Sequence, residues 1–238
     1  MPGTDLRIQR PQVGLCCLFL LVISVMAEAA THPCPGAKLA VDATDEENAR
    51  LACAGGTSAI DFLGALGLKK PPLLVIELVD RLPALHDTGL LGSFDADQGR
   101  LRVLSYPRCQ AIARRFPQFG MPMDTDMYRG IVAHEVGHAM MAFSFRGPRP
   151  SILAQEYIAY VTQFMAMSPG LRQHILEHTE ISAFEDESQL SLTYYLLDPQ
   201  AFGIAAFKHF MALPDPRVFV RRLLSDGSPA CCADSESD

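Results

Sequence analysis

The stretch from Tyr128 to Ser144 constrains the fold of this chain more than any other part of the sequence. It reads YRGIVAHEVGHAMMAFS, and a helix formed by it would be apolar on nearly every side. No proline interrupts it, and its only weak helix formers are Gly130 and Gly137. The sequence therefore predicts a buried helix from about Thr125 to Ser144.

This helix carries the pattern H-E-x-x-H, formed by His134, Glu135 and His138. Residues four apart on a helix lie about 40° apart around its axis, at about 100° per residue. Both imidazoles can therefore bind one metal ion, and Glu135 can reach a water molecule on that ion. Short patterns also arise by chance, so the alternative is a buried polar cluster in which the histidines bind no metal. Polar groups on a buried helix need partners, and a metal ion would provide them.

A second helix is predicted from Ile152 to Met167, with Ser151 as its N-cap. It carries Glu156, which follows His138 by 18 residues (156 − 138 = 18). That separation allows the first helix to end, the chain to turn, and the second helix to pack antiparallel beside the first. Glu156 is thus the predicted third metal ligand, and a surface glutamate is the alternative.

The pattern HEVGH, followed by a glutamate on a second helix, resembles the gluzincin branch of the zincin metallopeptidases. The segments AHEVGHAMM and AQEYIAYV resemble small uncharacterised exported bacterial zincin-like proteins. This resemblance covers about Tyr128 to Met167. It implies an α+β, zincin-like fold, in which a small N-terminal twisted β-sheet lies beside the motif helix and a mostly helical half follows. It also implies one Zn²⁺ per chain and a peptide or protein substrate bound along an edge strand, for which Leu101 to Tyr106 is the candidate.

The sequence departs from the patterns of two related groups. Compared with the thermolysin pattern, no Asn precedes Glu156 and no Ser-Asp follows it at the usual place, which leaves the partners of the metal ligands undefined. The metzincin pattern fails, because Met141 and Ser144 stand where glycine and histidine are needed.

A second histidine pair lies farther along the chain. His174, Glu177 and His178 match the inverted metal-binding pattern H-x-x-E-H. Their predicted helix is short and more polar than the helix over Tyr128 to Ser144. We therefore expect an exposed helix there rather than the main site.

Together these residues predict zinc-assisted hydrolysis of a peptide bond. His134, His138 and Glu156 would hold the zinc ion, and Glu135 would act as general base on the zinc-bound water. An additional donor is needed for the oxyanion, and the candidates are Tyr160, Tyr194, Tyr195 and His209. The alternative is a protein that binds zinc and peptides without turnover. Glu135 argues against it, because a purely structural site needs no base.

The first 29 residues are predicted to be a secretory signal peptide. Two arginines precede an apolar run from Val13 to Met26, and Ala27 and Ala29 provide a small-x-small cleavage site. The run is shorter than the about 20 residues that a membrane span needs. We expect cleavage after Ala29 and a periplasmic or secreted protein with no stable membrane anchor; an uncleaved anchor is the alternative.

The charge of the chain limits the classes of partner. It is −7 at pH 7, and the sequence has no basic cluster. This argues against nucleic acids and anionic membranes as partners. The chain left after cleavage, about 210 residues long, suits one domain with a full core. We therefore expect a single domain over residues 30–230 and an acidic, disordered tail over residues 231–238.

Five cysteines follow the predicted signal peptide. Export makes disulfides plausible, and the preferred pair is Cys34 with Cys53, which would tie the start of the domain to its first helix. The second predicted pair is Cys109 with Cys231 or Cys232, and the odd number leaves one thiol free or paired between chains. None of the five has a histidine at zinc-finger spacing, so a cysteine-based zinc site is not expected.

The remaining elements follow from short-range patterns. Thr44 to Glu47 matches a capping box, which opens a helix that runs to about Leu68 with a possible break at Gly55 and Gly56. Apolar runs and a turn signal predict strands at 73–79, 90–94 and 101–106, the last two forming a hairpin. Further helices are predicted at 109–116, 199–210 and 217–224.

Overall fold

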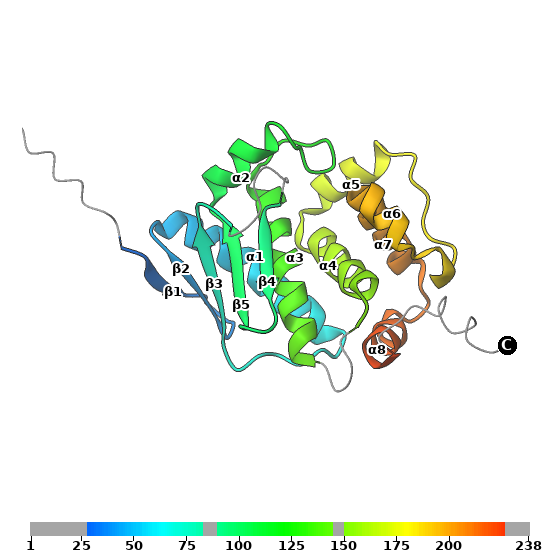
Figure 1. Ribbon diagram of the computed structural model, residues 1–238, viewed down its shortest axis with the longest axis horizontal. Helices are drawn as coiled ribbons and strands as arrows, with labels where there is room; N and C mark the ends of the chain where they lie inside the picture. Colours follow the sequence, from blue (N-terminus) through cyan, green and yellow to red (C-terminus); the bar gives the residue numbers. More distant parts are fainter. Residues whose placement is uncertain (1–27, 83–89, 145–149, 227–238) are drawn as a thin grey trace, which may run out of the picture.

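The computed structural model describes residues 28–82, 90–144 and 150–226. Within these ranges a five-stranded sheet forms first and a mostly helical half follows, so the predicted α+β class is confirmed. Figure 1 shows the sheet on one side of the molecule and the C-terminal helices on the other. The predicted signal peptide, apart from its last two residues, and the predicted acidic tail lie outside the described residues.

The sheet is mixed, with strand order β1-β2-β3-β5-β4. Its three central strands, β2, β3 and β5, run parallel, and β1 and β4 pair antiparallel at the two edges. The sequence patterns found β3, β4 and β5 but missed the short strands β1 and β2. The bounds are β1 Ala30–Pro33, β2 Leu39–Ala43, β3 Leu74–Val79, β4 Gly92–Asp95 and β5 Arg100–Leu104.

The predicted hairpin is confirmed, but the predicted edge strand is wrong. Leu101 to Tyr106 was the candidate edge, whereas β5 lies between β3 and β4 and pairs with both. The apolar side chains of β5 are fully buried, as a central strand requires. The edge strand on this side of the sheet is β4, which lies beside α3 (Thr125–Ser144).

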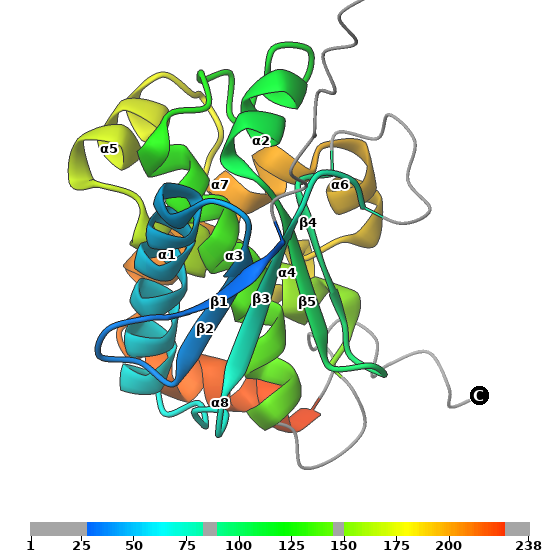
Figure 2. The ribbon, with the colours of Figure 1, turned by 90° about the vertical axis from the view of Figure 1, so that its left-hand side faces the viewer.

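The helices lie on one face of the sheet. Figure 2 shows the strands in front, with α1 (Glu46–Ala65) and α3 behind them. Ile76 of β3 is buried beneath these helices, whereas its neighbour Glu77 points to the other face because side chains alternate along a strand. There Glu77 pairs with Arg100 and Arg102, at N···O distances of 3.5 and 3.0 Å.

Helix α1 (Glu46–Ala65) is continuous, so the predicted break does not occur. A Cβ atom at Gly55 would lie 2.5 Å from the Arg129 carbonyl oxygen, and one at Gly56 would lie 2.5 Å from Leu39 Cδ2. The two glycines therefore allow α1 to approach α3 and the sheet closely. The cap is Asp45, whose carboxylate accepts a hydrogen bond from the Asn48 amide at 2.8 Å, one residue later than the predicted capping box.

Helices α3 (Thr125–Ser144) and α4 (Ile152–Ala166) form an antiparallel pair, as predicted. The Ser151 hydroxyl caps α4 by accepting from the Ala154 amide at 3.2 Å. Gly137 of α3 faces the backbone of Ala159 in α4, where a Cβ atom would lie 3.2 Å from Ala159 Cα. This glycine lets the two helices pack closely at the position of the H-E-x-x-H pattern.

Helices α5 to α8 build the side of the molecule opposite the sheet, whereas α2 lies next to one end of the sheet (Figure 1). Helix α7 packs against α4 and begins at Pro199, where Asp198 accepts from the Ala201 amide at 2.9 Å. The bounds of the remaining helices are α2 Tyr106–Ala113, α5 Pro169–Glu177, α6 Leu192–Leu197, α7 Pro199–Ala212 and α8 Pro216–Asp226, with a 3₁₀ turn η1 at Glu187–Gln189. Among the described residues, no helix has the length and apolarity that crossing a membrane requires.

The predicted disulfide between Cys34 and Cys53 is present and ties the β1–β2 connection to α1. Cys109 is a free, buried thiol, so its predicted pairing with a C-terminal cysteine is wrong. Burial raises the pKa of Cys109 to about 12. Cys231 and Cys232 themselves lie outside the described residues.

Candidate metal centre

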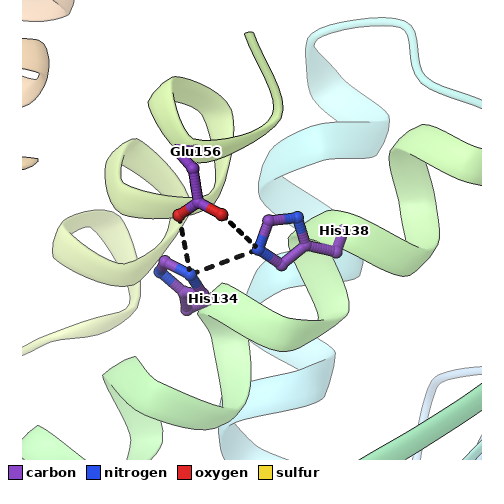
Figure 3. A group of neighbouring side chains, drawn as sticks. All are labelled: His134, His138 and Glu156. Atoms are coloured by element: carbon purple, nitrogen blue, oxygen red, sulfur yellow. Dashed lines mark hydrogen bonds and ion pairs between the residues drawn. The ribbon is translucent and has the colours of Figure 1, made fainter. Parts of the chain in front are cut away.

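The three predicted metal ligands converge where α3 and α4 pack together. His134 and His138 project from one face of α3 toward Glu156 of α4, as Figure 3 shows. The two Nε2 atoms are 3.3 Å apart, and each lies 3.6 Å from one carboxylate oxygen of Glu156. In the described part of the chain, these residues form the one group of three side chains able to hold a metal ion.

The protonation states of His138 and Glu156 suit metal binding. Burial acts to lower the pKa of His134, but the neighbouring Glu156 and Glu135 outweigh it and raise this pKa, so His134 must give up a proton when a metal binds. Burial lowers the pKa of His138 to about 4, so its imidazole is neutral with a free lone pair. Burial raises the pKa of Glu156, but the neighbouring His134 and His138 together outweigh burial and lower the pKa of this carboxyl. Glu156 is therefore a carboxylate, which is the form that binds a cation.

Glu135 lies next to these ligands and is 8% exposed. Burial raises its pKa to about 7, which suits a group that takes and returns a proton near neutral pH. Gly92 of the edge strand faces it directly: a Cβ atom there would lie 2.4 Å from Glu135 Cγ and 2.7 Å from Glu135 Oε1. The space that Glu135 occupies thus exists because residue 92 has no side chain.

Gln163 supports the first histidine and was not predicted from the sequence. It is 1% exposed, and its Oε1 lies 3.1 Å from Nδ1 of His134. If Nδ1–H donates to this oxygen, the lone pair of Nε2 faces Glu156 and the metal position. Gly130, one turn before His134, makes room for Gln163, because a Cβ atom there would lie 3.2 Å from Gln163 Cγ.

The candidate centre opens into a cavity of about 700 Å³. One wall is the segment that leads into and forms β4, and the opposite wall comes from α4 and the connection between α6 and α7. The cavity is lined by both histidines, Glu135, Glu156 and Gln163. A ligand in this cavity would therefore contact the metal position and the carboxylate of Glu135 together.

The structure divides the four candidate oxyanion donors into two pairs. Tyr160 and Tyr195 line the cavity. The Tyr160 ring lies nearly perpendicular to that of His134, with centroids 4.8 Å apart, and burial raises the pKa of Tyr195, a rise to which the charge of Glu156 adds. Burial raises the pKa of both phenols, so both hydroxyls keep their proton.

The other two candidates point elsewhere. Tyr194 packs edge-on against Phe184, with ring centroids 5.9 Å apart. His209 lies in the core, where its Nδ1 is 2.8 Å from the Tyr157 hydroxyl. Neither side chain lines the cavity among the described residues, so both are removed from the candidates.

The second histidine pair is exposed, as predicted. His174 and His178 stack on the surface of α5, with ring centroids 4.0 Å apart. Nδ1 of His178 is engaged with the His174 carbonyl oxygen at 2.8 Å, and Glu177 accepts a hydrogen bond from Gln173. This arrangement brings no third ligand to the pair within the described residues.

A family model matches residues 39–229, which include every strand from β2 onward, both site helices and all residues of the candidate centre. The chain belongs to DUF6639, a family of unknown function. Neither the curated proteins nor the solved structures give a match. What the family does must therefore be argued from the geometry of the centre.

The sequence predicted the helical ligands but not two other residues of the site, Gln163 and Gly92. Gln163 follows Glu156 by seven residues (163 − 156 = 7), which is two helical turns, and this spacing places it on the same face of α4. That spacing was a usable signal. Nothing in the sequence around Gly92 indicated its role, because that role depends on a contact with Glu135 of α3.

Proposed function

We propose that this chain is a zinc-dependent peptidase with a zincin-like fold. The observation that carries the proposal is the convergence of two histidines and one glutamate on a single point, with the Glu135 carboxyl beside them in the same cavity. A structural metal site is normally closed by four protein ligands, whereas a catalytic site offers three and keeps one position open. Three ligands are offered here by the described residues.

The distances between the ligand atoms fit zinc. Zn–N and Zn–O bonds are about 2.0–2.2 Å, so two ligands of a tetrahedral zinc ion lie about 3.3–3.6 Å apart. The two Nε2 atoms are 3.3 Å apart, and each lies 3.6 Å from a different carboxylate oxygen of Glu156, while one ligand atom from each residue can be chosen so that all three lie within 4.8 Å of one another. The donor set supports the same choice, because imidazole favours zinc and other late transition metals over magnesium and calcium.

When bound, a zinc ion lowers the pKa of a coordinated water to about 7 and polarises a carbonyl oxygen. The residues of the chain would do the rest. Glu135 is placed to accept the proton of the attacking water and to pass it to the leaving amine. Tyr160 and Tyr195 keep their hydroxyl protons and line the same cavity, so each can donate to the developing oxyanion.

The free edge of β4 supports a peptide as substrate. The Leu104 amide donates to the Leu91 carbonyl at 2.9 Å, so residues 91 and 104 form a hydrogen-bonded pair of the antiparallel ladder. Such pairs alternate, and the backbone groups of Gly92 and Phe94 therefore point away from β5. An extended peptide can pair with them as an added strand and pass beside Glu135.

We also infer that the protein acts outside the cytoplasm, after removal of the predicted signal peptide. The Cys34–Cys53 disulfide supports this location. Disulfides persist in oxidising compartments and are rare where thiols are kept reduced. The acidic charge of the chain gives no reason to expect a nucleic acid as partner.

The proposal is tested first by the zinc content of the purified protein. We expect one zinc per chain in the wild type and a large loss in Glu156→Ala. Glu135→Gln is the matched variant, because it keeps the shape of the side chain and should keep the zinc. A library of blocked peptides should be hydrolysed by the wild type and not by Glu135→Gln.

The alternatives give different results in the same experiment. A wild type without zinc, even after refolding with metal, would disprove the proposal and leave the histidines as a buried polar cluster. Zinc retained by the wild type without turnover of any peptide would indicate the non-catalytic zinc-binding protein instead. Zinc retained in Glu156→Ala would show that the third ligand is another residue.

A further inference from the structure

We propose that the cavity takes an internal, apolar and uncharged segment of a polypeptide, which makes the protein an endopeptidase rather than an exopeptidase. This inference rests on the proposed peptidase function and names the substrate class of the same site. Three independent features of the cavity carry it: its extent along β4, the apolar side chains at its rim, and the sign of its charged side chains.

The cavity extends along β4 in both directions from the reacting centre. Gly92, which faces Glu135, marks that centre. On one side the cavity is lined by Leu90 and Leu91, and on the other it continues past Phe94 to Ala96. Seven residues of extended chain span about 23 Å, so a bound peptide can continue beyond the cleaved bond at both ends. An exopeptidase instead needs a wall that stops the chain next to the centre.

Large apolar side chains are exposed around the cavity. Leu90, Phe116, Ile152 and Leu197 all line it and are 41%, 39%, 48% and 80% exposed. They come from four separate parts of the chain: the approach to β4, the turn after α2, the start of α4 and the end of α6. Exposed apolar groups gathered at one cavity favour an apolar ligand that covers them.

The charged side chains that line the cavity are all acidic among the described residues. They are Glu135, Glu156 and Asp198. Recognition of a terminal carboxylate relies on arginine or lysine, and none of the described lining residues is either. A free C-terminus beyond the cleaved bond would face Asp198, and no described lining residue offers an arginine or lysine to pair with it. A free carboxylate close to the cleaved bond is therefore disfavoured.

The occupant that satisfies all three features is the middle of an extended polypeptide. Its backbone would pair with Gly92 and Phe94, and its apolar side chains would cover Leu90, Ile152 and Leu197. Both termini would lie outside the cavity. A dipeptide, or a short peptide with a free carboxylate near the cleaved bond, leaves the apolar rim exposed and gains fewer contacts.

The test uses the zinc-loaded full-length protein and a fluorescent decapeptide with leucine and phenylalanine at its centre and blocked ends. Binding is measured by anisotropy with Glu135→Gln, and cleavage by mass spectrometry with the wild type. We expect cleavage inside the blocked peptide. The same sequence shortened to end in a free carboxylate after the central pair should bind Glu135→Gln at least about tenfold more weakly.

Variants of the rim locate the binding surface. Leu197→Asp should weaken binding of the blocked peptide by about tenfold or more, because it removes an apolar contact and adds an acidic charge. Leu73→Asp is the matched control: Leu73 is 57% exposed and does not line the cavity, so binding should be unchanged. Circular dichroism of both variants confirms that they fold.

The outcomes separate this inference from the proposed function. Removal of single residues from unblocked ends, with the blocked peptide untouched, would overturn the inference and leave a zinc peptidase. Binding of the blocked peptide that Leu197→Asp weakens, without any hydrolysis by the wild type, would overturn the proposed function and support the apolar groove. If Leu197→Asp does not change the affinity for the blocked peptide, the inference is overturned, whether or not the wild type hydrolyses peptides.

Discussion

Gln163 contacts the outer nitrogen of His134 through a neutral amide, whereas a carboxylate is a common partner of metal-bound histidines. Its other amide atom, Nε2, is buried and has no hydrogen-bond partner among the described residues. A buried polar group without a hydrogen-bond partner usually destabilises the folded protein. Its retention here is explained if the oxygen is needed to hold the ring of His134 in place.

This interpretation predicts the effect of two substitutions on zinc affinity. Gln163→Leu removes the acceptor for Nδ1–H and should weaken zinc binding by about 10- to 100-fold. Gln163→Glu keeps an oxygen at the same reach and should stay within about tenfold of the wild type. The measurement is competition for zinc with a chromophoric chelator.

The control for this experiment is Gln173→Leu, because Gln173 is an exposed glutamine of α5 that bonds only to Glu177 among the described contacts. It should leave zinc affinity unchanged. A urea titration of each metal-free variant separates loss of the contact from loss of the fold. Equal zinc affinity of Gln163→Leu and the wild type would show that Gln163 only fills space.

At the scale of the elements, α7 is fitted to α4 through one glycine. A Cβ atom at Gly203 would lie 2.4 Å from Cδ1 and 2.6 Å from Cγ of the Tyr160 ring. The ring is buried between α7 and His134 and cannot move without displacing one of them. Because residue 203 has no side chain, α7 can lie this close to α4 beside the cavity.

Gly203→Ala is therefore expected to destabilise the protein, although alanine is the better helix former. Overpacking against Tyr160 should cost about 1–3 kcal/mol, against a gain of about 1 kcal/mol in helix propensity. Gly170→Ala is the control, because no atom lies within 4 Å of a Cβ at that position, and it should be neutral or stabilising. Urea midpoints measure both, and a stabilised Gly203→Ala would contradict the tight packing.

The disulfide acts on a different pair of elements. Cys34 and Cys53 are 19 residues apart and join the β1–β2 connection to α1. Closing a loop of that length should stabilise the fold by about 3 kcal/mol, because it restricts the unfolded chain. The double variant Cys34→Ala/Cys53→Ala should lose that amount of unfolding free energy in urea. Reduction of the disulfide in the wild type should lower the unfolding free energy by a similar amount. A loss in the double variant alone, or in the reduced wild type alone, would contradict this explanation.

At the scale of the whole molecule, the sequence predicted what depends on local pattern. The bounds of α3, the Ser151 cap and the position of Glu156 opposite His138 all follow from helical spacing and turn chemistry. The identity of the edge strand did not follow, because the two strands of a hairpin look alike until a third strand pairs with one of them. The predicted helix break at Gly56 was also wrong, because this glycine allows a close contact with Leu39, which is distant in the sequence.

The core of the helical half contains one buried histidine that should make the stability of the molecule depend on pH. His209 of α7 contacts the Tyr157 hydroxyl of α4 at 2.8 Å and packs edge-on against Phe219 of α8. Burial lowers the pKa of His209, and the more distant charge of Asp186 opposes this only in part. The folded protein therefore keeps His209 neutral at pH values where the unfolded chain protonates it.

The sign of the effect follows from this difference. Above about pH 6.5, the usual pKa of histidine, both states are neutral and His209 contributes no pH dependence. As the pH falls below that value the unfolded state binds a proton that the folded state refuses, so stability falls by at most about 1.4 kcal/mol per pH unit. His209→Gln should show a smaller loss of unfolding free energy between pH 7 and pH 5 than the wild type. His174→Gln, at an exposed position, should follow the wild type. Urea titrations at both pH values, with zinc present throughout, measure the difference, and parallel curves for His209→Gln and wild type would show that His209 protonates equally in both states.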